Sequence, residues 1–360
     1  MLIDRYAMYR AAMDALYFSG AHRMARPITA GVGAILTLHH VRPARTHSFQ
    51  PNKTLEIEPE FLEQVIVFLR DRKVDLVDLD EMHHRLVERD FSRPFVALTF
   101  DDGYRDNLEF AWPVLERHGV PFAVYIVSNF ADGSGELWWE ALERLVANES
   151  RLELEVDGKR RTIDCSDADR KYRAFGEIAG LLPGESNGIE RQAVLRNLAS
   201  QYDLDLHQQC RELCMSWQEL TELAKNQICT IGAHTVNHVF LSNVDERLAR
   251  REMGDCADAI ASSLGRRPAH FAFPYGHAQA AGPREFRLAR ELGYKTAVTT
   301  QPNVLLPHEF DRLMALPRIT LNGNFQLLRH VDVLLSGAPF ALKNGMRRLR
   351  KSDRAWRESH

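Results

Sequence analysis

One ten-residue stretch, Phe95-Val-Ala-Leu-Thr-Phe-Asp-Asp-Gly-Tyr104, constrains the fold more than any other part of the sequence. Six apolar or β-favouring residues follow a proline and run directly into two carboxylates and a glycine, which predicts a buried strand that opens into a loop. Asp101 and Asp102 repel each other when both are removed from water, so either they are solvated turn residues or a cation lies beside them. Because Asp and Gly are common in turns, the stretch taken alone favours the turn.

Strand-like and helix-like segments alternate along most of the chain. The apolar pattern of 59–73 predicts an amphipathic helix that faces a core, and glycines at the ends of later helical segments fit the C′ position. Alternation at this spacing is typical of a parallel sheet, and seven or eight strands suit a closed or nearly closed barrel of βα units. The expected strands are 34–41, 74–79, 95–100, 122–127, 228–233, 269–273, 294–299 and 315–321.

Residues 131–215 interrupt this alternation. The alternating pattern of 152–163 around Asp157-Gly158 predicts a β-hairpin, and two polar helical segments are expected after it, at about 166–182 and 188–203. We interpret 131–215 as an insertion on one face of the main domain, where it helps to shape a substrate groove.

The predicted division is an N-terminal helical extension (1–33), a barrel domain (34–340) that contains the insertion, and a basic tail (341–360). From Lys343 onward the tail has seven Lys and Arg residues against Asp353 and Glu358. A solvated end is the favoured interpretation, and attraction to anionic lipid headgroups is the alternative.

Composition excludes several classes of protein. Lys and Arg number 46 against 49 Asp and Glu, so the chain lacks the global basic field that indicates a nucleic-acid partner. The five cysteines contain no CxxC pair, which argues against a disulfide framework and against a thiolate zinc site. The N-terminal region has no apolar run of the length of a signal peptide or a membrane span, which predicts a cytoplasmic protein.

A second group of reactive side chains lies in Gly232-Ala-His-Thr-Val-Asn-His238, where an expected strand ends. His234 and His238 are four residues apart, a spacing at which two imidazoles can share one metal ion. An HxxxH pair alone is a weak signal, since the chain has 15 histidines. Asp102 also follows a strand, however, and parallel strands gather their carboxyl ends at one rim. One carboxylate and two imidazoles leave coordination positions open, as a catalytic ion requires.

Two further strand ends are expected at the same rim. Phe273-Pro-Tyr-Gly276 can direct a backbone N–H into the site, although an ordinary turn explains the motif equally well. Arg318 interrupts an apolar strand, and an inward arginine needs a carboxylate partner, for which Asp101 is the candidate. An outward, solvated Arg318 is the alternative.

Three motifs, Thr99-Phe-Asp-Asp-Gly-Tyr104, His234-Thr-Val-Asn-His238 and Phe273-Pro-Tyr-Gly276, occur in this order. They resemble those of the polysaccharide deacetylases of carbohydrate esterase family four, which include the nodulation-type chitooligosaccharide deacetylases. The resemblance covers about 34–321 apart from the insertion. It implies a distorted (β/α) barrel that binds one divalent ion, usually Zn²⁺, and removes acetyl groups from N-acetylated, less often O-acetylated, sugars.

The resemblance also implies a role for each matching residue. Asp101 becomes the general base, and Asp102, His234 and His238 become the metal ligands. Tyr275 supplies the backbone N–H of the oxyanion hole. These roles agree with the chemistry of the residues, because a water acidified by a metal ion, a carboxylate base and an N–H donor are what acyl hydrolysis needs.

The sequence departs from the family pattern in two places. The usual arginine two residues before the proline is Ala272 here, so the partner of the base is expected to be Arg318. The late motif that usually supplies the general acid has no clear counterpart, since His330 lies beyond the last strand. In members whose first strand ends in Tyr-His, that early histidine can act as the acid, and the matching residue is His39. Alternation places His39 and His40 on opposite faces, and the sequence does not say which one points inward.

The predicted function is therefore metal-dependent hydrolysis of N-acetyl groups on an amino-sugar oligomer or polysaccharide, with Zn²⁺ as the favoured ion and acetylated carbohydrate as the partner. One alternative is hydrolysis of a cyclic amide or ureide by the same groups. Another is a non-catalytic carbohydrate-binding protein, in which Ala272 marks lost activity. A third, an Fe(II) oxygenase that uses the His₂-carboxylate set, is disfavoured because those ligands usually lie on an antiparallel barrel.

Overall fold

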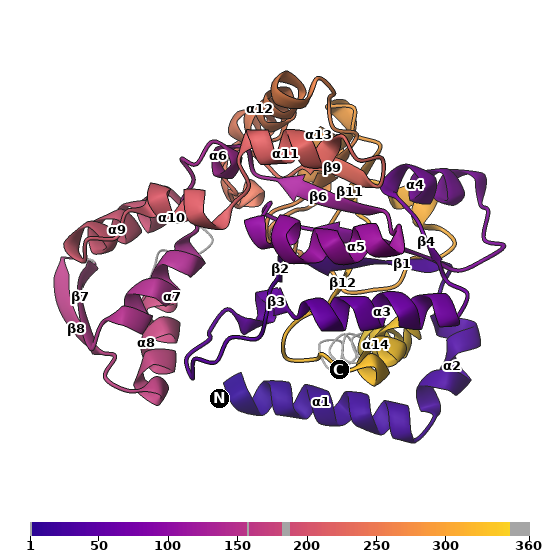
Figure 1. Cartoon of the computed structure of the whole chain (residues 1–360), viewed down its shortest axis with the longest axis horizontal. Helices are drawn as coiled ribbons and strands as arrows, with labels where there is room; N and C mark the ends of the chain where they lie inside the picture. The colour runs from indigo at the N-terminus through magenta and orange to yellow at the C-terminus, as the bar shows by residue number, and fades with distance from the viewer. Residues whose placement is uncertain (1, 157, 182–187, 346–360) are drawn as a thin grey trace, which may run out of the picture.

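A parallel sheet forms the centre of the protein. The computed structural model describes residues 2–156, 158–181 and 188–345. Seven strands follow one another in the order β11-β10-β9-β6-β5-β1-β12, and β4 (Asp75–Leu76) pairs with β5 beside this path (Figure 1). All pairings in this sheet are parallel, which confirms the predicted architecture of βα units. The seven strands are β1 (Gly33–Leu38), β5 (Phe95–Phe100), β6 (Phe122–Ile126), β9 (Cys229–Ala233), β10 (His270–Ala272), β11 (Thr296–Val298) and β12 (Ile319–Thr320).

The two ends of this path approach each other and give a distorted (β/α) barrel. β12 pairs with β1, and Leu316, three residues before β12, forms a parallel bridge with Val298 of β11. The Leu316 N–H donates to the Ala297 carbonyl at 3.0 Å, and the Thr299 N–H donates to the Leu316 carbonyl at 2.9 Å. Because only a few residues pair along this side, the barrel is irregular here.

The central strands are buried on both faces, which explains their continuous apolar sequences. All six residues of β5 and all five of β6 are buried. The register pairs Leu38 with Phe100 and Ile126 with Ala233, so the carboxyl ends of β1, β5, β6 and β9 lie at one rim. The loops that follow these strands therefore meet in space.

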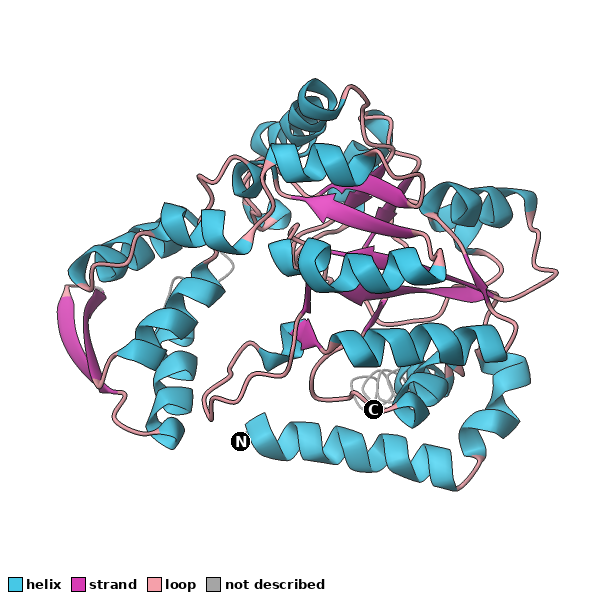
Figure 2. Cartoon of the chain, viewed as in Figure 1, coloured by secondary structure: helices cyan, strands magenta, loops and turns pink. Residues whose placement is uncertain are grey.

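Helices surround the sheet (Figure 2). The predicted amphipathic helix is α3, in which Phe61, Val65, Phe68 and Leu69 are buried as expected. The expected helix ends at Gly119 and Gly265 adopt the left-handed conformation. Among the described residues, every helix is too short or too polar to cross a bilayer. The helices of the main body are α1 (Leu2–Phe18), α2 (Ala21–Thr29), α3 (Pro59–Asp71), α4 (Leu79–Glu88), α5 (Trp112–His118), α11 (Trp217–Ala224), α12 (Glu246–Leu264), α13 (Pro283–Glu291) and α14 (Leu328–Leu335).

The predicted insertion contains a small core of its own. Leu142, Leu152 and Ile163 belong to a buried cluster between its helices and its hairpin. The hairpin is present as the antiparallel pair β7 and β8, although Asp157 of the predicted turn lies outside the described residues. Figure 1 shows the helices and the hairpin that follow residue 137 as a separate layer on the side to which the strands of the barrel point. They are α7 (Trp138–Asn148), β7 (Arg151–Val156), β8 (Lys159–Asp164), α8 (Ala168–Leu181), α9 (Gly188–Gln201) and α10 (Leu206–Leu213). The short helix α6 (Ser128–Ala131), at the start of the predicted insertion, lies beside α12 of the main body.

Short elements complete the chain. Two of them form a separate parallel pair near the insertion, β2 (His40–Val41) with β3 (Glu56–Ile57). The helix after β5 begins with a π-helical turn, and turns of this kind are frequent beside functional sites. The remaining short helical segments are η1 (Lys53–Leu55), η2 (Asn107–Ala111), η3 (Leu241–Asn243) and η4 (Glu309–Arg312).

Helix α11 begins with the predicted capping box. Ser216 Oγ accepts a hydrogen bond from the Glu219 N–H, and the Glu219 carboxylate accepts one from the Ser216 N–H at 2.7 Å. Ser216→Ala removes the first of these bonds and should lower the free energy of unfolding by about 1 kcal/mol in urea denaturation. Ser262→Ala, at an exposed position within α12, is the control and should change it by less than about 0.5 kcal/mol. Equal losses in the two variants would contradict the capping role.

Candidate metal centre and active site

The loop after β5 buries two adjacent carboxylates. Asp101 and Asp102 are each 2% exposed, so the interpretation as solvated turn residues is wrong. Asp102 and Gly103 both adopt positive φ, 71° and 72°, which turns the chain sharply at the end of the strand. As a result the two carboxylates leave the backbone in different directions and meet different partners.

Asp101 faces Arg318, as the sequence predicted. The guanidinium binds both carboxylate oxygens, with Nη1 to Oδ1 at 2.7 Å and Nη2 to Oδ2 at 2.6 Å. Arg318 is completely buried, and its remaining donors reach the Thr99 hydroxyl at 3.2 Å and the Thr299 carbonyl at 3.0 Å. Burial raises the pKa of Asp101, but Arg318 and nearby imidazoles outweigh that effect and hold the pKa below its usual range. Asp101 is therefore an ionised carboxylate of fixed orientation.

Asp102, His234 and His238 surround a single point. Asp102 Oδ1 lies 3.5 Å from His234 Nε2 and 3.4 Å from His238 Nε2, and one ligand atom from each residue falls within 4.8 Å of the others. His234 follows β9 directly, and His238 reaches the same point because Thr235 and His238 adopt left-handed backbone conformations. The rim of the barrel thus brings together a carboxylate from one strand end and two imidazoles from another.

The three side chains fit a divalent metal ion. Two ligands at about 2.0–2.1 Å from a tetrahedral ion are separated by about 3.3 Å, close to the two spacings that Asp102 makes here. Asp102 Oδ1 is buried and has no hydrogen-bond partner among the described residues. Burial and the neighbouring charge of Asp101 raise the pKa of Asp102 to about 8, and a cation at this point would remove that penalty.

A backbone contact prepares His234 for the same role. His234 Nδ1 lies 2.7 Å from the Ala272 carbonyl, to which it can only donate a proton, so Nε2 is left with its lone pair toward Asp102 and His238. Metal-binding histidines are commonly oriented by such a contact from the second ring nitrogen. The methyl side chain of Ala272 cannot pair with Asp101, but the carbonyl oxygen of Ala272 orients the His234 ring.

Backbone strain is concentrated around this point. Seven non-glycine residues of the described chain have positive φ, and Asp102, Thr235, His238 and Tyr275 are four of them. Such conformations cost of order 1 kcal/mol each and persist where the surrounding structure holds them. The site therefore depends on its loops being clamped by the rest of the fold.

Tyr275 lies against His238, with ring centroids 4.8 Å apart. Its φ of 60° turns the backbone at the end of the Phe273–Gly276 motif, and its carbonyl accepts a 2.6 Å hydrogen bond from the Thr300 hydroxyl. A Cβ at the next residue, Gly276, would lie only 2.5 Å from the Thr300 nitrogen, so only glycine fits this turn. The motif is therefore at the candidate site, as expected.

The structure separates the two histidines that the sequence left open. His39 is half-buried near Asp101, Arg318 and His234, and its removal from water lowers its pKa to about 4. His39 Nδ1 is buried and has no hydrogen-bond partner among the described residues. His40 points the other way, so His39 is the histidine beside the candidate base.

Sequence reasoning missed the buried cluster around His40. His40 Nδ1 lies 2.5 Å from Asp106, which follows the aspartate loop, and Nε2 lies 3.4 Å from Glu140 on α7. Burial alone would lower the pKa of His40, but the two carboxylates outweigh it and raise the pKa to about 9. This cluster ties the insertion to the rim of the barrel. The sequence around His40 gave no indication of this cluster, because its two carboxylate partners are 66 and 100 residues away in the chain.

The insertion also supplies an aromatic wall that the sequence did not predict. Trp139 stands 5.1 Å from the His238 ring and donates a 2.8 Å hydrogen bond to the Tyr104 hydroxyl, and Trp138 donates one to the Tyr275 hydroxyl at 3.2 Å. Phe130, the residue just before the insertion, adds to this wall and lies 6.1 Å from the same histidine. The sequence feature that could have indicated this wall is the pair of adjacent tryptophans, Trp138 and Trp139, at the start of α7.

Comparison with known proteins places this site in a family. The family model described as polysaccharide deacetylase matches residues 88–154 and 192–297, which include the two aspartates, the histidine pair and Tyr275. The chain belongs to the polysaccharide deacetylase family. The match leaves out His39 and Arg318, and its gap falls inside the predicted insertion. None of the curated proteins matches the chain.

Solved polysaccharide deacetylases share the fold of this family member. The Streptococcus pyogenes deacetylase PplD in complex with acetate is 16% identical, with a TM-score of 0.54 over 81% of this chain and 92% of its own. IcaB from Ammonifex degensii is 18% identical, with a TM-score of 0.53 over 84% and 97%. A de-N-acetylase from Aggregatibacter actinomycetemcomitans is 12% identical, with a TM-score of 0.53 over 84% and 99%. At these identities the similarity establishes the fold alone.

The buried Arg318–Asp101 pair should be important for stability. Arg318→Met leaves a buried carboxylate without its partner and should lower the free energy of unfolding by about 3–5 kcal/mol in urea denaturation. The double variant Arg318→Met/Asp101→Asn removes both charges and should recover a large part of that loss. Arg287→Met, which breaks only exposed ion pairs, is the control and should cost less than about 1 kcal/mol. A double variant as unstable as Arg318→Met would contradict this account.

The charge of His40 should make stability depend on pH in a defined direction. The pKa of His40 is higher in the folded protein than in the unfolded chain, so its contribution is complete below about pH 6.5 and disappears as the pH rises through about 9. The difference in unfolding free energy between the wild type and His40→Gln should therefore shrink between pH 7 and 9.5. His207→Gln, at an exposed position on α10, is the control. A difference for His40→Gln that stays constant over this range would rule out a buried imidazolium.

Proposed function

We propose that this member of the polysaccharide deacetylase family is a metal-dependent hydrolase that removes N-acetyl groups from an amino-sugar oligomer or polysaccharide. The observation that carries the proposal is the convergence of Asp102, His234 and His238 on one point, directly beside the ionised carboxylate of Asp101. The acetate complex of PplD and the de-N-acetylase of Aggregatibacter actinomycetemcomitans support acetyl transfer to water as the reaction. A cytoplasmic location stays a prediction.

Zn²⁺ is the ion that we propose for the three ligands. Two imidazoles and one carboxylate with an open position are typical of a catalytic rather than a structural zinc site. Bound there, the ion would supply Lewis acidity, which lowers the pKa of a water molecule and polarises an acetyl carbonyl. His234 is already set in the required tautomer by the Ala272 carbonyl.

Asp101 is the proposed general base. Both of its oxygens are oriented by Arg318, and its lowered pKa keeps it ionised at neutral pH, so it can accept the proton of the attacking water. A carboxylate with a low pKa is a weak base, and a water that has first been acidified is the substrate suited to it. Asp101 adjoins Asp102 in the chain, and its charge acts on Asp102 and His234, so the proposed base lies next to the proposed ligands.

Tyr275 and His39 are the proposed partners of the reacting amide. The Tyr275 backbone N–H would stabilise the negative charge on the acetyl oxygen, and the tight turn at Gly276 fixes its direction. His39 is neutral at pH 7 because of its low pKa, so it can pass a proton to the leaving amine only after it has accepted one during turnover. The aromatic wall of Trp139 and Phe130 would limit the access of bulk water to these groups.

The reaction is tested with protein stripped of metal and reloaded with single divalent ions. Acetate release from chitooligosaccharides and other N-acetylated and O-acetylated sugars is the expected result, restored best by Zn²⁺. Ring opening of a cyclic ureide without acetate release would favour the second hydrolase. Glycan binding without acetate release under any ion would identify a binding protein, and oxygen consumption with Fe(II) would identify an oxygenase.

Two substitutions distinguish the proposed roles. Asp101→Asn should lower turnover at least a hundredfold, as loss of a general base does, while the protein still binds one equivalent of Zn²⁺. His234→Ala should lose both acetate release and the bound ion. Acetate release and metal content by atomic emission measure the two effects.

A histidine outside the site provides the control for these variants. His207→Ala, on the exposed face of α10, should keep the activity and the metal content of the wild type. Full activity in either Asp101→Asn or His234→Ala would overturn the assigned roles.

A further inference from the structure

The most exposed apolar side chains of the protein lie near its two termini. Among the described residues, the five large apolar side chains with the greatest exposure are Ile28 (87%), Met24 (82%), Phe18 (74%), Met8 (65%) and Leu342 (53%). The first four belong to α1 and α2, and Leu342 follows α14. An unburied Met or Ile is ordinary when it stands alone, but a contiguous group of them indicates a surface that binds something.

Three of these residues border a shallow apolar groove. The groove, of about 470 Å³, lies between α2 and the segment 338–345. Met24 and Ile28 are one turn apart on α2, and they adjoin Ala21 and Ala25, which line the groove. We call Met24, Ile28, Leu342 and the groove residues the terminal patch. The groove is lined by Leu16, Ala21, Ala25, Thr29, Ala338, Ala341, Leu342 and Gly345.

The segments of the sequence that carry the terminal patch are basic in an otherwise acidic chain. Residues 15–30 and 336–360 together contain nine Lys and Arg residues and two Asp and Glu residues. The rest of the chain contains 37 Lys and Arg residues and 47 Asp and Glu residues. Within 15–30 and 336–345 the sequence has no acidic residue, and the nearby Asp332 of α14 accepts a 2.6 Å hydrogen bond from Arg26. Positive charge is therefore concentrated on the segments that carry the exposed apolar side chains.

We propose that the terminal patch docks this protein on the surface of an anionic lipid bilayer. Apolar side chains that project from a helix, with Arg23 on the same helix and Lys343 on the facing segment, fit the boundary between anionic headgroups and acyl chains. A protein partner would need a complementary shape for side chains that project from the surface, whereas a bilayer adapts to them. The sequence that follows Gly345 has six Lys and Arg residues against two acidic ones, a composition that favours anionic headgroups.

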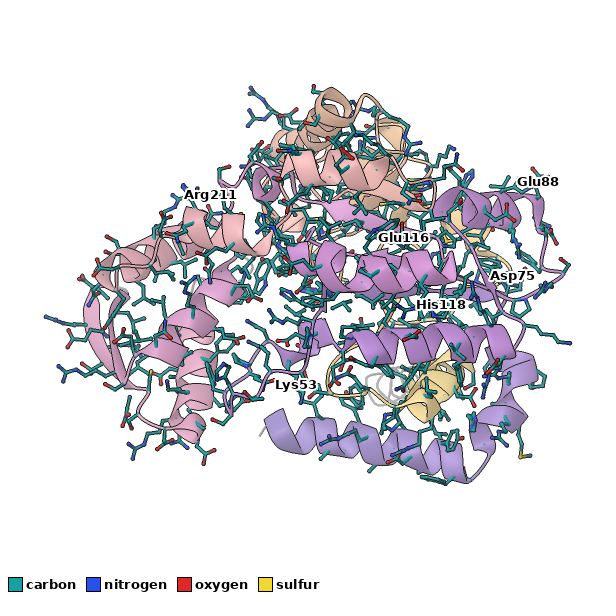
Figure 3. The ribbon with its side chains drawn as sticks, in the orientation of Figure 1. Lys53, Asp75, Glu88, Glu116, His118 and Arg211 are labelled. Atoms are coloured by element: carbon teal, nitrogen blue, oxygen red, sulfur yellow. The ribbon has the colours of Figure 1, made fainter. Side chains whose placement is uncertain are left out.

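This docking surface and the candidate active site lie at opposite ends of the barrel. Ala30 and Gly31, just after α2, line a small pocket with Gly33 and Phe95, which begin β1 and β5. The candidate site lies where the strands end. Figure 3 labels Asp75 of β4 near the first end and Arg211 of α10 in the layer at the other. A docked protein would therefore hold its site away from the bilayer, toward a glycan that extends from the membrane or passes along it.

Co-sedimentation of the full chain with lipid vesicles tests the proposal. The protein should bind vesicles of phosphatidylcholine mixed with phosphatidylglycerol, bind phosphatidylcholine alone at least tenfold more weakly, and be released by high salt. Met24→Gln/Ile28→Gln should weaken the binding to the mixed vesicles at least tenfold, because two side chains lose their insertion into the acyl region. Both positions are so exposed that the fold should be unaffected, and far-UV circular dichroism checks this.

Val67→Gln/Val87→Gln is the matched control. These two valines are also exposed, at 43% and 45%, but they belong to α3 and α4 and do not line the groove, so their replacement should leave vesicle binding unchanged. No binding to the mixed vesicles, or equal binding of the wild type and Met24→Gln/Ile28→Gln, would overturn the proposal. So would light scattering that shows a lipid-free dimer which this variant converts to monomer, because a second copy would then cover the patch. None of these outcomes depends on deacetylase activity.

Discussion

Two adjacent carboxylates buried at the end of one strand must each be matched by positive charge, and the rest of the site follows from that requirement. Asp101 has its match within the chain, in the buried guanidinium of Arg318. Asp102 has the imidazoles of His234 and His238 beside it instead, and burial together with the charge of Asp101 raises its pKa. A divalent ion would complete this arrangement, and its charge would favour ionisation of both Asp102 and a nearby water.

The architecture of the barrel explains how so few residues build the site. Parallel strands end at one rim, so the loops after β5, β9 and β10 deliver their side chains to a common point without long excursions. The left-handed conformations of Asp102, Thr235 and Tyr275 aim those loops inward. The insertion then closes one side of the rim, where Glu140 pairs with His40 and Trp139 packs against His238. These contacts of the insertion help to hold the strained loops in place and keep the charged groups of the site buried.

The proposed functions use different ends of the molecule. The candidate site occupies the rim at which the strands end, while the terminal patch lies near the end at which they begin. Separation of this kind allows the orientation on a surface and the binding of a substrate to be adjusted independently. Charge is distributed accordingly, since basic residues are concentrated on the terminal segments and the remainder of the chain is acidic.

The amino-acid sequence on its own determined the positions of most strands and helices and the residue types of the candidate site, because these features depend on residues that are close together in the chain. Apolar strands, amphipathic helices, the capping box at Ser216 and the motifs around Asp101 and His234 are encoded by neighbours in the chain, where period and spacing are directly readable. The tertiary structure alone decided which of His39 and His40 faces the base, and it alone revealed the pairing of His40 with Glu140 and the wall formed by Trp138 and Trp139. Those contacts join residues far apart in sequence, and the direction of a side chain at the end of a strand depends on turns and packing that no local period specifies.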